Sequence, residues 1–347
     1  MLSIKHLFLV TCIGFFACRL SASSSLGGLA GAYLRPPVGA VAVAMGGAQT
    51  ASPDYLASWW NPAIIATSKT KKISLGTGYR SLGRLEGFSS LELRIQRLGL
   101  GFVVLYRGDP YIDGLVDADE YEIGPVSYNT VTSKIAFSYL VSRRLSLGAS
   151  LGMYYQSLPA YDDNALDRTN EWSFAIGGID LAAHYRLLDN LTFGVAVRHL
   201  NVVEDWQFAM GSLSSAETQM VPPTIVLGSR FSSELLGKPF FWNCDIIGYA
   251  ISGELNSLSH MTAVLNNGIE WQMWESLYLR GGIGDVAFDS NIFDDRDRYS
   301  ESFSLRVTAG FSVDLSGVKE GLRLNYGLSN SKIMAGANQQ VDIVFYF

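Results

Sequence analysis

Short segments in which apolar and small polar residues alternate recur along the sequence, and they limit the folds open to the chain. In 302–313, the apolar residues Phe303, Leu305, Val307, Ala309, Phe311 and Val313 alternate with Ser302, Ser304, Arg306, Thr308, Gly310 and Ser312. The segments 91–96, 145–155 and 191–198 repeat this period of two. Because successive side chains of a β-strand point to opposite faces, each segment predicts a strand with one apolar and one polar face.

The length of these strands and the composition favour a membrane over water as the surrounding medium. Each segment spans about ten residues, which is the length of a tilted transmembrane strand. Charged residues make up only 17% of the chain, which also holds 35 glycines and 12% aromatic residues. Beyond the export signal described below, no apolar run reaches the roughly 18 residues that a membrane helix needs. Soluble sandwiches also alternate, but their strands bury the apolar face, so we predict an all-β transmembrane barrel.

The number of strands and the lengths of the connections are consistent with such a barrel. We place about 14 antiparallel strands, at 72–80, 87–97, 99–107, 129–141, 143–156, 171–187, 190–199, 221–233, 239–251, 260–273, 275–284, 301–314, 320–329 and 338–347. Turns after the even-numbered strands are short, whereas most other connections are long, notably 108–128, 157–170, 200–220 and 285–300. Bacterial barrels have short periplasmic turns and long outer loops, and an even number of strands leaves both ends in the periplasm. The predicted sheet must close, because hydrocarbon leaves an open edge without hydrogen-bond partners.

The N-terminus predicts export. Lys5 precedes an apolar run at 7–17, and small residues up to Ala22 provide a cleavage site, so residues 1–22 are expected to be a signal peptide. Lipoprotein processing at Cys18 is the alternative, although the residues before it fit a lipobox poorly.

The C-terminus predicts the destination. Apolar residues alternate over 338–347 and the last residue is Phe347, which is similar to the signal that the bacterial barrel-insertion machinery reads. The sequence therefore predicts a protein of the outer membrane of a Gram-negative-type bacterium, in contact with outer-membrane lipid.

Charged residues are scattered on the predicted inward face. They are Glu92, Arg94, Arg198, Glu270, Arg280 and Arg306. These residues are candidate channel or ligand groups, and the alternative is a set of internal salt bridges that stiffen the wall. A group of aromatic residues, Trp242, Trp271, Trp274 and Tyr278, is expected in the interfacial girdle.

Residues 27–66 do not alternate and are rich in Ala and Gly, which makes them a candidate plug for the lumen. The motif Gly-Ala-x-Ala-x-x-Met-Gly-Gly-Ala at 39–48, followed by Asp54 and by Ala-Ser-Trp-Trp-Asn-Pro-Ala at 57–63, resembles the N-terminal signature of the PorV/PorQ proteins. These proteins are a branch of the FadL-type outer-membrane barrels, in which this segment is an inward-folded hatch ahead of the barrel. The resemblance implies a hatch at 23–66 and a barrel at 67–347.

The motif residues are carried over one by one. Gly39, Ala40, Met45, Gly46, Gly47, Asp54, Asn61, Pro62 and Ala63 would form the hatch and its entry turn. Asn61-Pro62 initiates a turn because proline fixes its own φ. Members of the family often carry a second acidic residue beside the aspartate, whereas position 55 is Tyr.

Enzymatic and nucleic-acid functions find no support in the sequence. There is no HExxH motif, no Cys/His cluster and no Gly-x-Ser-x-Gly elbow, so we expect no catalysis, no cofactor and no metal. Acidic residues gather in the predicted outer loops without the spacing of an EF-hand, which indicates a solvated loop surface. The net charge is −6, and no basic patch stands out along the sequence, which disfavours nucleic acid as a partner.

Two functions remain after these exclusions. FadL-type barrels bind hydrophobic small molecules and pass them by way of the hatch, so the resemblance implies transport of a hydrophobic ligand. The PorV/PorQ branch resembles accessory components of type IX secretion, whose outer loops hold a secreted cargo protein. Transport is our leading hypothesis, and a dry, tightly filled lumen would count against it.

Overall fold

The computed structural model describes residues 30–52, 55–112, 126–161, 168–210, 213–250, 261–288, 305–330 and 337–347. The predicted signal peptide at 1–22 and Asp54 of the motif lie outside these ranges. The strands are β1 (Lys72–Tyr79), β2 (Leu85–Ile95), β3 (Leu98–Ile112), β4 (Val126–Leu140), β5 (Leu145–Tyr161), β6 (Arg168–Leu188), β7 (Leu191–Leu200), β8 (Val203–Met210), β9 (Leu213–Met220), β10 (Thr224–Leu235), β11 (Lys238–Ala250), β12 (Met261–Trp274), β13 (Leu277–Phe288), β14 (Arg306–Asp314), β15 (Leu322–Asn330) and β16 (Ala337–Tyr346). The helices are η1 (Ala32–Leu34), α2 (Ala40–Ala44), α3 (Ala57–Trp60), η2 (Pro62–Thr67) and η3 (Ser81–Gly83).

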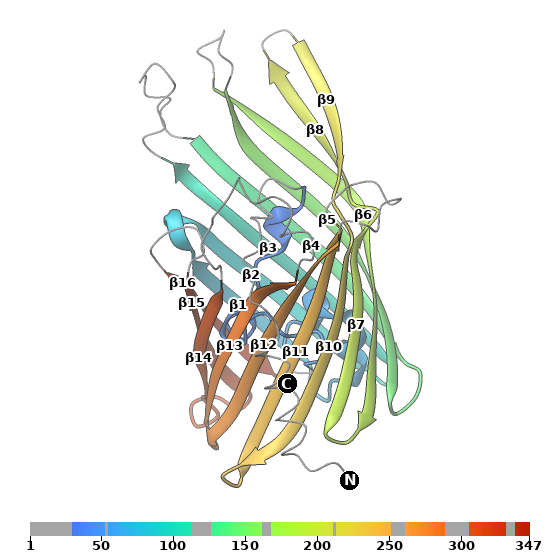
Figure 1. The fold of residues 1–347 in the computed structure, drawn as a ribbon, viewed down its shortest axis with the longest axis vertical. Helices are drawn as coiled ribbons and strands as arrows, with labels where there is room; N and C mark the ends of the chain where they lie inside the picture. Colours follow the sequence, from blue (N-terminus) through green and yellow to red (C-terminus); the bar gives the residue numbers. More distant parts are fainter. Residues whose placement is uncertain are drawn as a thin grey trace.

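The strands form a closed antiparallel barrel, as the alternating pattern predicted. All sixteen strands except β8 and β9 belong to the ring, which leaves fourteen. Sequential neighbours pair with each other, β7 pairs with β10, and β16 returns to β1. Figure 1 shows these tilted strands surrounding a segment near the N-terminus, drawn in blue. The predicted all-β fold of 14 strands is therefore confirmed.

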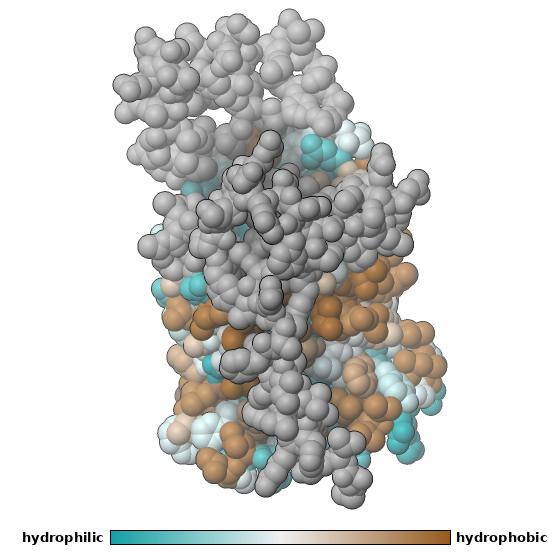
Figure 2. All heavy atoms as spheres, viewed as in Figure 1, coloured by the Kyte–Doolittle hydropathy of each residue, from teal (hydrophilic) through white to brown (hydrophobic). Residues whose placement is uncertain are grey.

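The outer surface of the barrel is apolar. On β5, Leu147 and Leu151 each expose 48% of their surface, whereas Ser146 and Ser150, which alternate with them, face inward and are buried. Figure 2 shows hydrophobic side chains, in brown, over much of the described outer surface of the lower barrel. An exposed apolar surface of this extent is the mark of contact with lipid. Among the described residues, no helix is long and apolar enough to cross a membrane.

The short turns lie together at one end of the barrel, as predicted, whereas most of the predicted long loops lie outside the described residues. The turns after β2, β4, β6, β10, β12 and β14 are short and lie at the lower end in Figure 1. The strands β8 and β9 lie at the opposite end, with the strand ends that the predicted longer connections would join. We refer to these as the short-turn end and the long-loop end.

The structure corrects the prediction of a loop at 200–220, where β8 and β9 form a hairpin. The hairpin extends the wall, because β8 pairs with β6 over Trp172–Phe174, beyond the residues of β6 that pair with β7. At its base the Val221 amide donates a hydrogen bond of 3.0 Å to the Val202 carbonyl oxygen. Polar residues such as Glu, Asp, Gln, Ser and Thr are spread through both strands, so no apolar period marked them in the sequence.

The structure also corrects one of the predicted girdle residues. Tyr278 lies two residues before Arg280 on β13 and so shares its inward face. The ring of Tyr278 lies 4.6 Å from the guanidinium carbon of Arg323. The aromatic side chain therefore packs against inward-facing cations, and not in the lipid interface. Trp242 and Trp271 lie on the outward face, and Trp274 is the exposed last residue of β12.

Candidate functional site

The described residues between 30 and 67 lie inside the barrel and are the candidate site. Helix α2 contacts β13 to β16, whereas η2 contacts β2 to β6, which form the opposite arc of the wall. Residues 40–44 and 63–66 are almost completely buried. We call residues 30–52 and 55–67 the inner segment. Because it is not paired as a strand, its backbone polar groups need other partners.

Two aspartates of the wall accept hydrogen bonds from backbone amides of the inner segment. The Ala40 amide, at the start of α2, donates to Oδ2 of Asp342 on β16 at 2.6 Å. The amides of Gln49 and Thr50 both donate to Oδ2 of Asp245 on β11 at 2.9 Å. The residue before α2 is a glycine with no side-chain cap, so Asp342 supplies from the wall the acceptor that a capping residue normally provides.

Glu92, one of the predicted inward charges, holds α3 in the same way. Its Oε1 accepts hydrogen bonds from the Ser58 amide at 2.8 Å and from the Ser58 hydroxyl at 3.0 Å. Its Oε2 lies 3.1 Å from Nζ of Lys72. Glu92 thus both closes a salt bridge in the wall and fixes the start of a helix.

Arginines of the wall hold the carbonyl oxygens of the inner segment. Arg198 donates to the Trp60 carbonyl oxygen at 2.5 Å, and Arg306 donates to the Gly46 carbonyl oxygen at 2.8 Å. Arg107 donates to the Pro36 carbonyl oxygen at 2.8 Å. Hydrogen bonds with a charged partner are about twice as strong as neutral ones, so these contacts fix the segment firmly.

The remaining predicted inward charges make contacts elsewhere in the barrel. Glu270 and Arg280 form a salt bridge of 2.6 Å between adjacent strands, as the alternative of internal salt bridges anticipated. Arg94 lies at the short-turn end, where it donates to the carbonyl oxygens of Gln96 at 2.7 Å and Ser68 at 3.0 Å. Only Glu92, Arg198 and Arg306 of the six therefore touch the centre of the inner segment.

The sequence reasoning did not single out Asp245, Asp342 and Arg107, although they hold the segment as closely as the predicted residues do. A signal was present, because Asp342 stands between Val341 and Ile343 in the final strand and interrupts its apolar character. An acidic side chain on the inward face of a strand needs a donor there, and this requirement could have marked it.

The motif residues that the structure describes shape the turns of the inner segment. Gly39, Gly46 and Gly47 have φ values of 92°, 65° and 89°, which a side chain would strain. The Asn61 side chain accepts a hydrogen bond from the Ala63 amide at 3.1 Å and donates to the Thr50 carbonyl oxygen at 2.8 Å. The last motif residues are Pro62, which begins η2, the buried Met45, and Ala40 at the start of α2.

Glycines of the wall let the inner segment approach closely. A Cβ atom added to Gly327 would lie 2.2 Å from the Ala40 carbonyl oxygen, and one added to Gly194 would lie 2.1 Å from that of Thr50. Both distances are far below van der Waals contact. The small inward residues of the predicted strands therefore fit the backbone of the inner segment, in addition to lining the interior.

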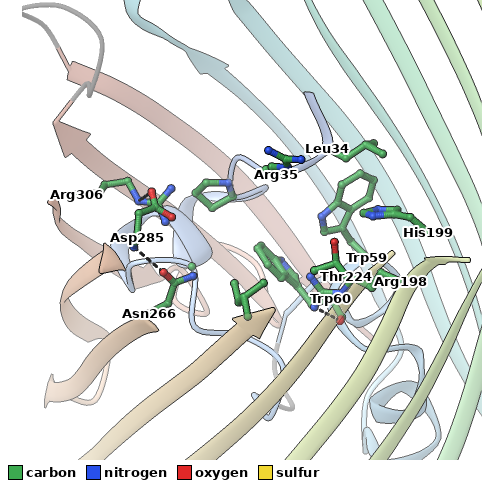
Figure 3. A pocket seen from close by; sticks show the side chains of 13 residues that line it. Leu34, Arg35, Trp59, Trp60, Arg198, His199, Thr224, Asn266, Asp285 and Arg306 are labelled. Carbon is green, nitrogen blue, oxygen red and sulfur yellow. Dashed lines mark hydrogen bonds and ion pairs between the residues drawn. The ribbon is translucent and has the colours of Figure 1, made fainter. Parts of the chain in front are cut away.

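A small cavity remains between the inner segment and the wall (Figure 3). Trp59, Trp60, Arg198 and His199 gather on one side of it, and Arg306 and Asp285 on the other. Its volume is about 30 Å³, which leaves room for roughly two water molecules. A hydrophobic ligand of ordinary size therefore does not fit here unless the inner segment moves.

Each tryptophan of α3 packs against a cation of the wall. Nζ of Lys134 lies 4.6 Å from the centre of the Trp59 ring, and the guanidinium carbon of Arg198 lies 5.2 Å from that of Trp60. Lys134 in turn donates to Asp180 at 2.6 Å. Cation–π contacts of this kind add to the hydrogen bonds that hold α3 against the wall.

The inner segment also contacts the β8–β9 hairpin. The Tyr33 hydroxyl donates a hydrogen bond of 2.8 Å to Oε1 of Glu204 on β8. Burial, and next the nearby Glu204 charge, raise the pKa of Tyr33 well above its ordinary value. The hydroxyl therefore stays protonated and remains a donor at neutral pH.

Comparison with known proteins adds a likeness in fold. No protein-family model and no curated protein matches the sequence. Among solved structures, the toluene transporter TbuX of Ralstonia pickettii is similar, with a TM-score of 0.56 and 14% identity over 89% of this chain and 97% of that chain. The toluene transporter TodX of Pseudomonas putida has a TM-score of 0.57 and 14% identity over 89% of this chain and 97% of that chain. A FadL homologue of Pseudomonas aeruginosa has a TM-score of 0.58 and 11% identity over 90% of this chain and 98% of that chain.

These values show a shared fold at low sequence identity. The chain has the architecture of a FadL-type barrel along nearly the whole length of those proteins. A closed β-barrel with an apolar outer surface is the form in which strands cross a bacterial outer membrane. The protein is therefore an outer-membrane β-barrel, as the sequence predicted.

Proposed function

We propose that this chain is an outer-membrane channel for hydrophobic small molecules and that residues 23–66 act as its hatch. The observation that carries the proposal is that side chains, and not strand pairing, hold the inner segment to the wall. Such contacts break one by one without opening the sheet. Solved barrels of this fold are described as toluene transporters and as a monoaromatic hydrocarbon channel, which supports the choice of ligand class.

The filled lumen determines how such a channel would work. The cavity beside Trp59 and Trp60 is too small for a hydrophobic ligand, and the inner segment contacts both arcs of the wall around it. Passage then requires the inner segment to leave its contacts, and ligand binding would have to favour the displaced state. A tightly filled interior counts against transport through this state, so the proposal depends on movement of the inner segment.

The test weakens the two aspartate anchors. The double variant Asp245→Asn/Asp342→Asn keeps side-chain size but places an amide where each carboxylate accepts amide hydrogen bonds. We expect the single-channel conductance in planar bilayers to rise several-fold, because the inner segment spends more time displaced. In cells without their own FadL-type channels, the unaltered chain should support uptake of labelled toluene. The variant should raise this uptake, for the same reason that it raises the conductance.

The matched control is Asp189→Asn, which removes a carboxylate from an exposed turn and should leave conductance and uptake unchanged. No uptake of toluene or of a long-chain fatty acid above that of cells without the protein would refute the channel. A double variant that folds and conducts like the unaltered chain would refute the hatch.

A second candidate is an accessory component of a type IX-like secretion system that binds cargo proteins. The motif at 39–63 resembles PorV/PorQ proteins, and the β8–β9 hairpin projects at the long-loop end, where a cargo would dock (Figure 1). Excision of residues 203–220 separates the two candidates. Loss of cargo from the cell surface with unchanged toluene uptake would favour secretion. Recognition of β16, which ends beside Phe347, by the barrel-insertion machinery also stays a prediction.

A further inference from the structure

The short-turn end of the barrel carries an uneven distribution of charge. Exposed basic residues lie before β1, in the turns after β2 and β4, and near the end of β6. They are Lys69, Arg97, Arg143, Arg144 and Arg186, which we call the basic arc. Asp189 is the one acidic residue in the described segments 68–71, 96–97, 141–144 and 186–190. This concentration of positive charge contrasts with a net charge of −6 for the whole chain.

The barrel brings these residues together from distant parts of the sequence. The strands β1 to β7 are consecutive in the sheet, so the turns that join them are neighbours. The Arg186 amide donates to the Arg144 carbonyl oxygen at 2.8 Å, and the Leu140 amide donates to the Arg97 carbonyl oxygen at 2.8 Å. Like charges are therefore held next to one another on a rigid framework.

Intramolecular partners do not neutralise this charge. Within the part of the chain that the structure describes, none of the five side chains of the basic arc forms an ion pair or a side-chain hydrogen bond. Lys71 also lies here, but its backbone exchanges hydrogen bonds with that of Phe347, beside the terminal carboxylate. Adjacent like charges repel, so the arc has an electrostatic reason to bind an anionic partner.

The opposite side of the short-turn end lacks this excess of positive charge. In or beside the turns after β10, β12 and β14 lie Glu234, Glu275 and Glu320 together with Lys238 and Lys319. In addition, Arg323 lies 3.8 Å from Asp314. Charge of both signs is therefore mixed here, and this side provides an internal comparison.

Exposed apolar residues stand in or beside the basic arc. Leu98, Val141 and Leu188 expose 54%, 43% and 55% of their surface. Figure 2 shows hydrophilic residues at the lower right edge below the brown surface, where Figure 1 places the turn between β4 and β5. The basic arc thus lies at the boundary of the apolar surface, which is the level of the lipid headgroups.

We propose that the basic arc binds the anionic headgroups of phospholipids in the leaflet on the short-turn side of the membrane. Arginine and lysine side chains lie with their stems along apolar surface and their charges among headgroups, which matches this mixture of residues. A docking site for an acidic protein would not need exposed leucine and valine beside its cations. The inference depends on the membrane position of the barrel and not on its proposed transport function.

The experiment compares anionic and zwitterionic lipids around the purified full-length barrel. Spin-labelled phosphatidylglycerol and phosphatidylcholine are titrated into vesicles of phosphatidylcholine that contain the protein, and the fraction in contact with it is measured. We expect a roughly two- to fivefold preference for phosphatidylglycerol. The preference should fall as salt is raised, because exposed charges are screened.

The variant Arg97→Gln/Arg144→Gln removes two charges of the basic arc and should bring the preference close to one. The control Lys238→Gln/Lys319→Gln removes two charges from the opposite side and should preserve it. All these side chains lie at turns, and heat-modifiable migration in gels confirms that each barrel has folded. Equal contact with both lipids, or a preference that the Arg97→Gln/Arg144→Gln variant retains, would overturn the proposal. Binding of soluble polyglutamate without lipid preference would assign the arc to an acidic protein instead.

Discussion

At the scale of single residues, the inward face of the barrel is fitted to the inner segment. Carboxylates meet its amides, guanidinium groups meet its carbonyl oxygens, and glycines stand where its backbone comes closest. A backbone that is buried without strand pairing needs each of these contacts, because an unsatisfied buried polar group costs about 1–3 kcal/mol. The polar inward face is thus a specific binding surface for the N-terminal part of the same chain.

The substitution Gly327→Ala tests this fit. The added methyl group would lie 2.2 Å from the Ala40 carbonyl oxygen, so the inner segment must shift away from β15. We expect the free energy of unfolding to fall by about 1–3 kcal/mol, as for other overpacked sites. The measurement is the urea dependence of tryptophan fluorescence for the barrel folded in phospholipid vesicles.

Gly281→Ala is the control for this substitution. Gly281 lies on β13, and the nearest atom to an added Cβ there is the Thr308 carbonyl oxygen at 3.8 Å, which is ordinary contact. Its unfolding should be close to that of the unaltered protein. Equal unfolding curves for both variants would show that the segment does not press on the wall at Gly327.

At the scale of elements, the short helices of the inner segment depend on the wall. Helix α2 has five residues and no side-chain cap of its own. Isolated helices of this length are unstable in water because nucleation is costly. The Asp342 carboxylate at its start and the Thr308 hydroxyl, which donates to the Ala44 carbonyl oxygen at 2.8 Å, supply the missing partners.

The β8–β9 hairpin is an element that the barrel can lose. Among the described residues its strand pairing with the ring is with β6, and its base is closed by the hydrogen bond between Val202 and Val221. We expect a chain in which a Gly-Gly link replaces residues 203–220 to fold into the same barrel. The measurements are heat-modifiable migration and the far-ultraviolet circular dichroism spectrum. Failure to form the compact band would show that the Tyr33–Glu204 contact is essential to the ring.

At the scale of the whole molecule, contact with lipid determines which face of each strand points outward. Leu151 lies in the middle of the membrane-crossing part of β5, whereas Leu188 lies at the turn after β6. Both are outward and about half exposed, at 48% and 55%. They differ chiefly in their depth in the bilayer.

Depth should therefore decide the effect of an introduced charge. We expect Leu151→Arg to lower the free energy of unfolding from vesicles by about 2–4 kcal/mol, and Leu188→Arg to lower it by about 0–1 kcal/mol. Urea titration in vesicles of one lipid composition measures both. Equal losses at the two positions would contradict the assigned membrane position.

The local period of the sequence determined which segments become strands. Alternation in 145–155 and 302–313 determined which side chains face lipid, because a strand in a closed barrel has only two faces. It also determined that the sheet closes, since open edges are not stable in hydrocarbon. The hairpin at 203–220 escaped prediction because it lies beyond the lipid, where no apolar period is required.

Only the tertiary structure decided which residues meet across the barrel. Asp342 and Ala40 are separated by 302 positions, and no local pattern relates the two. The same holds for the basic arc, whose residues come from separate turns and so formed no basic patch along the sequence. Local periodicity sets the faces of strands, whereas ring closure places distant residues side by side, and the candidate site depends on that closure.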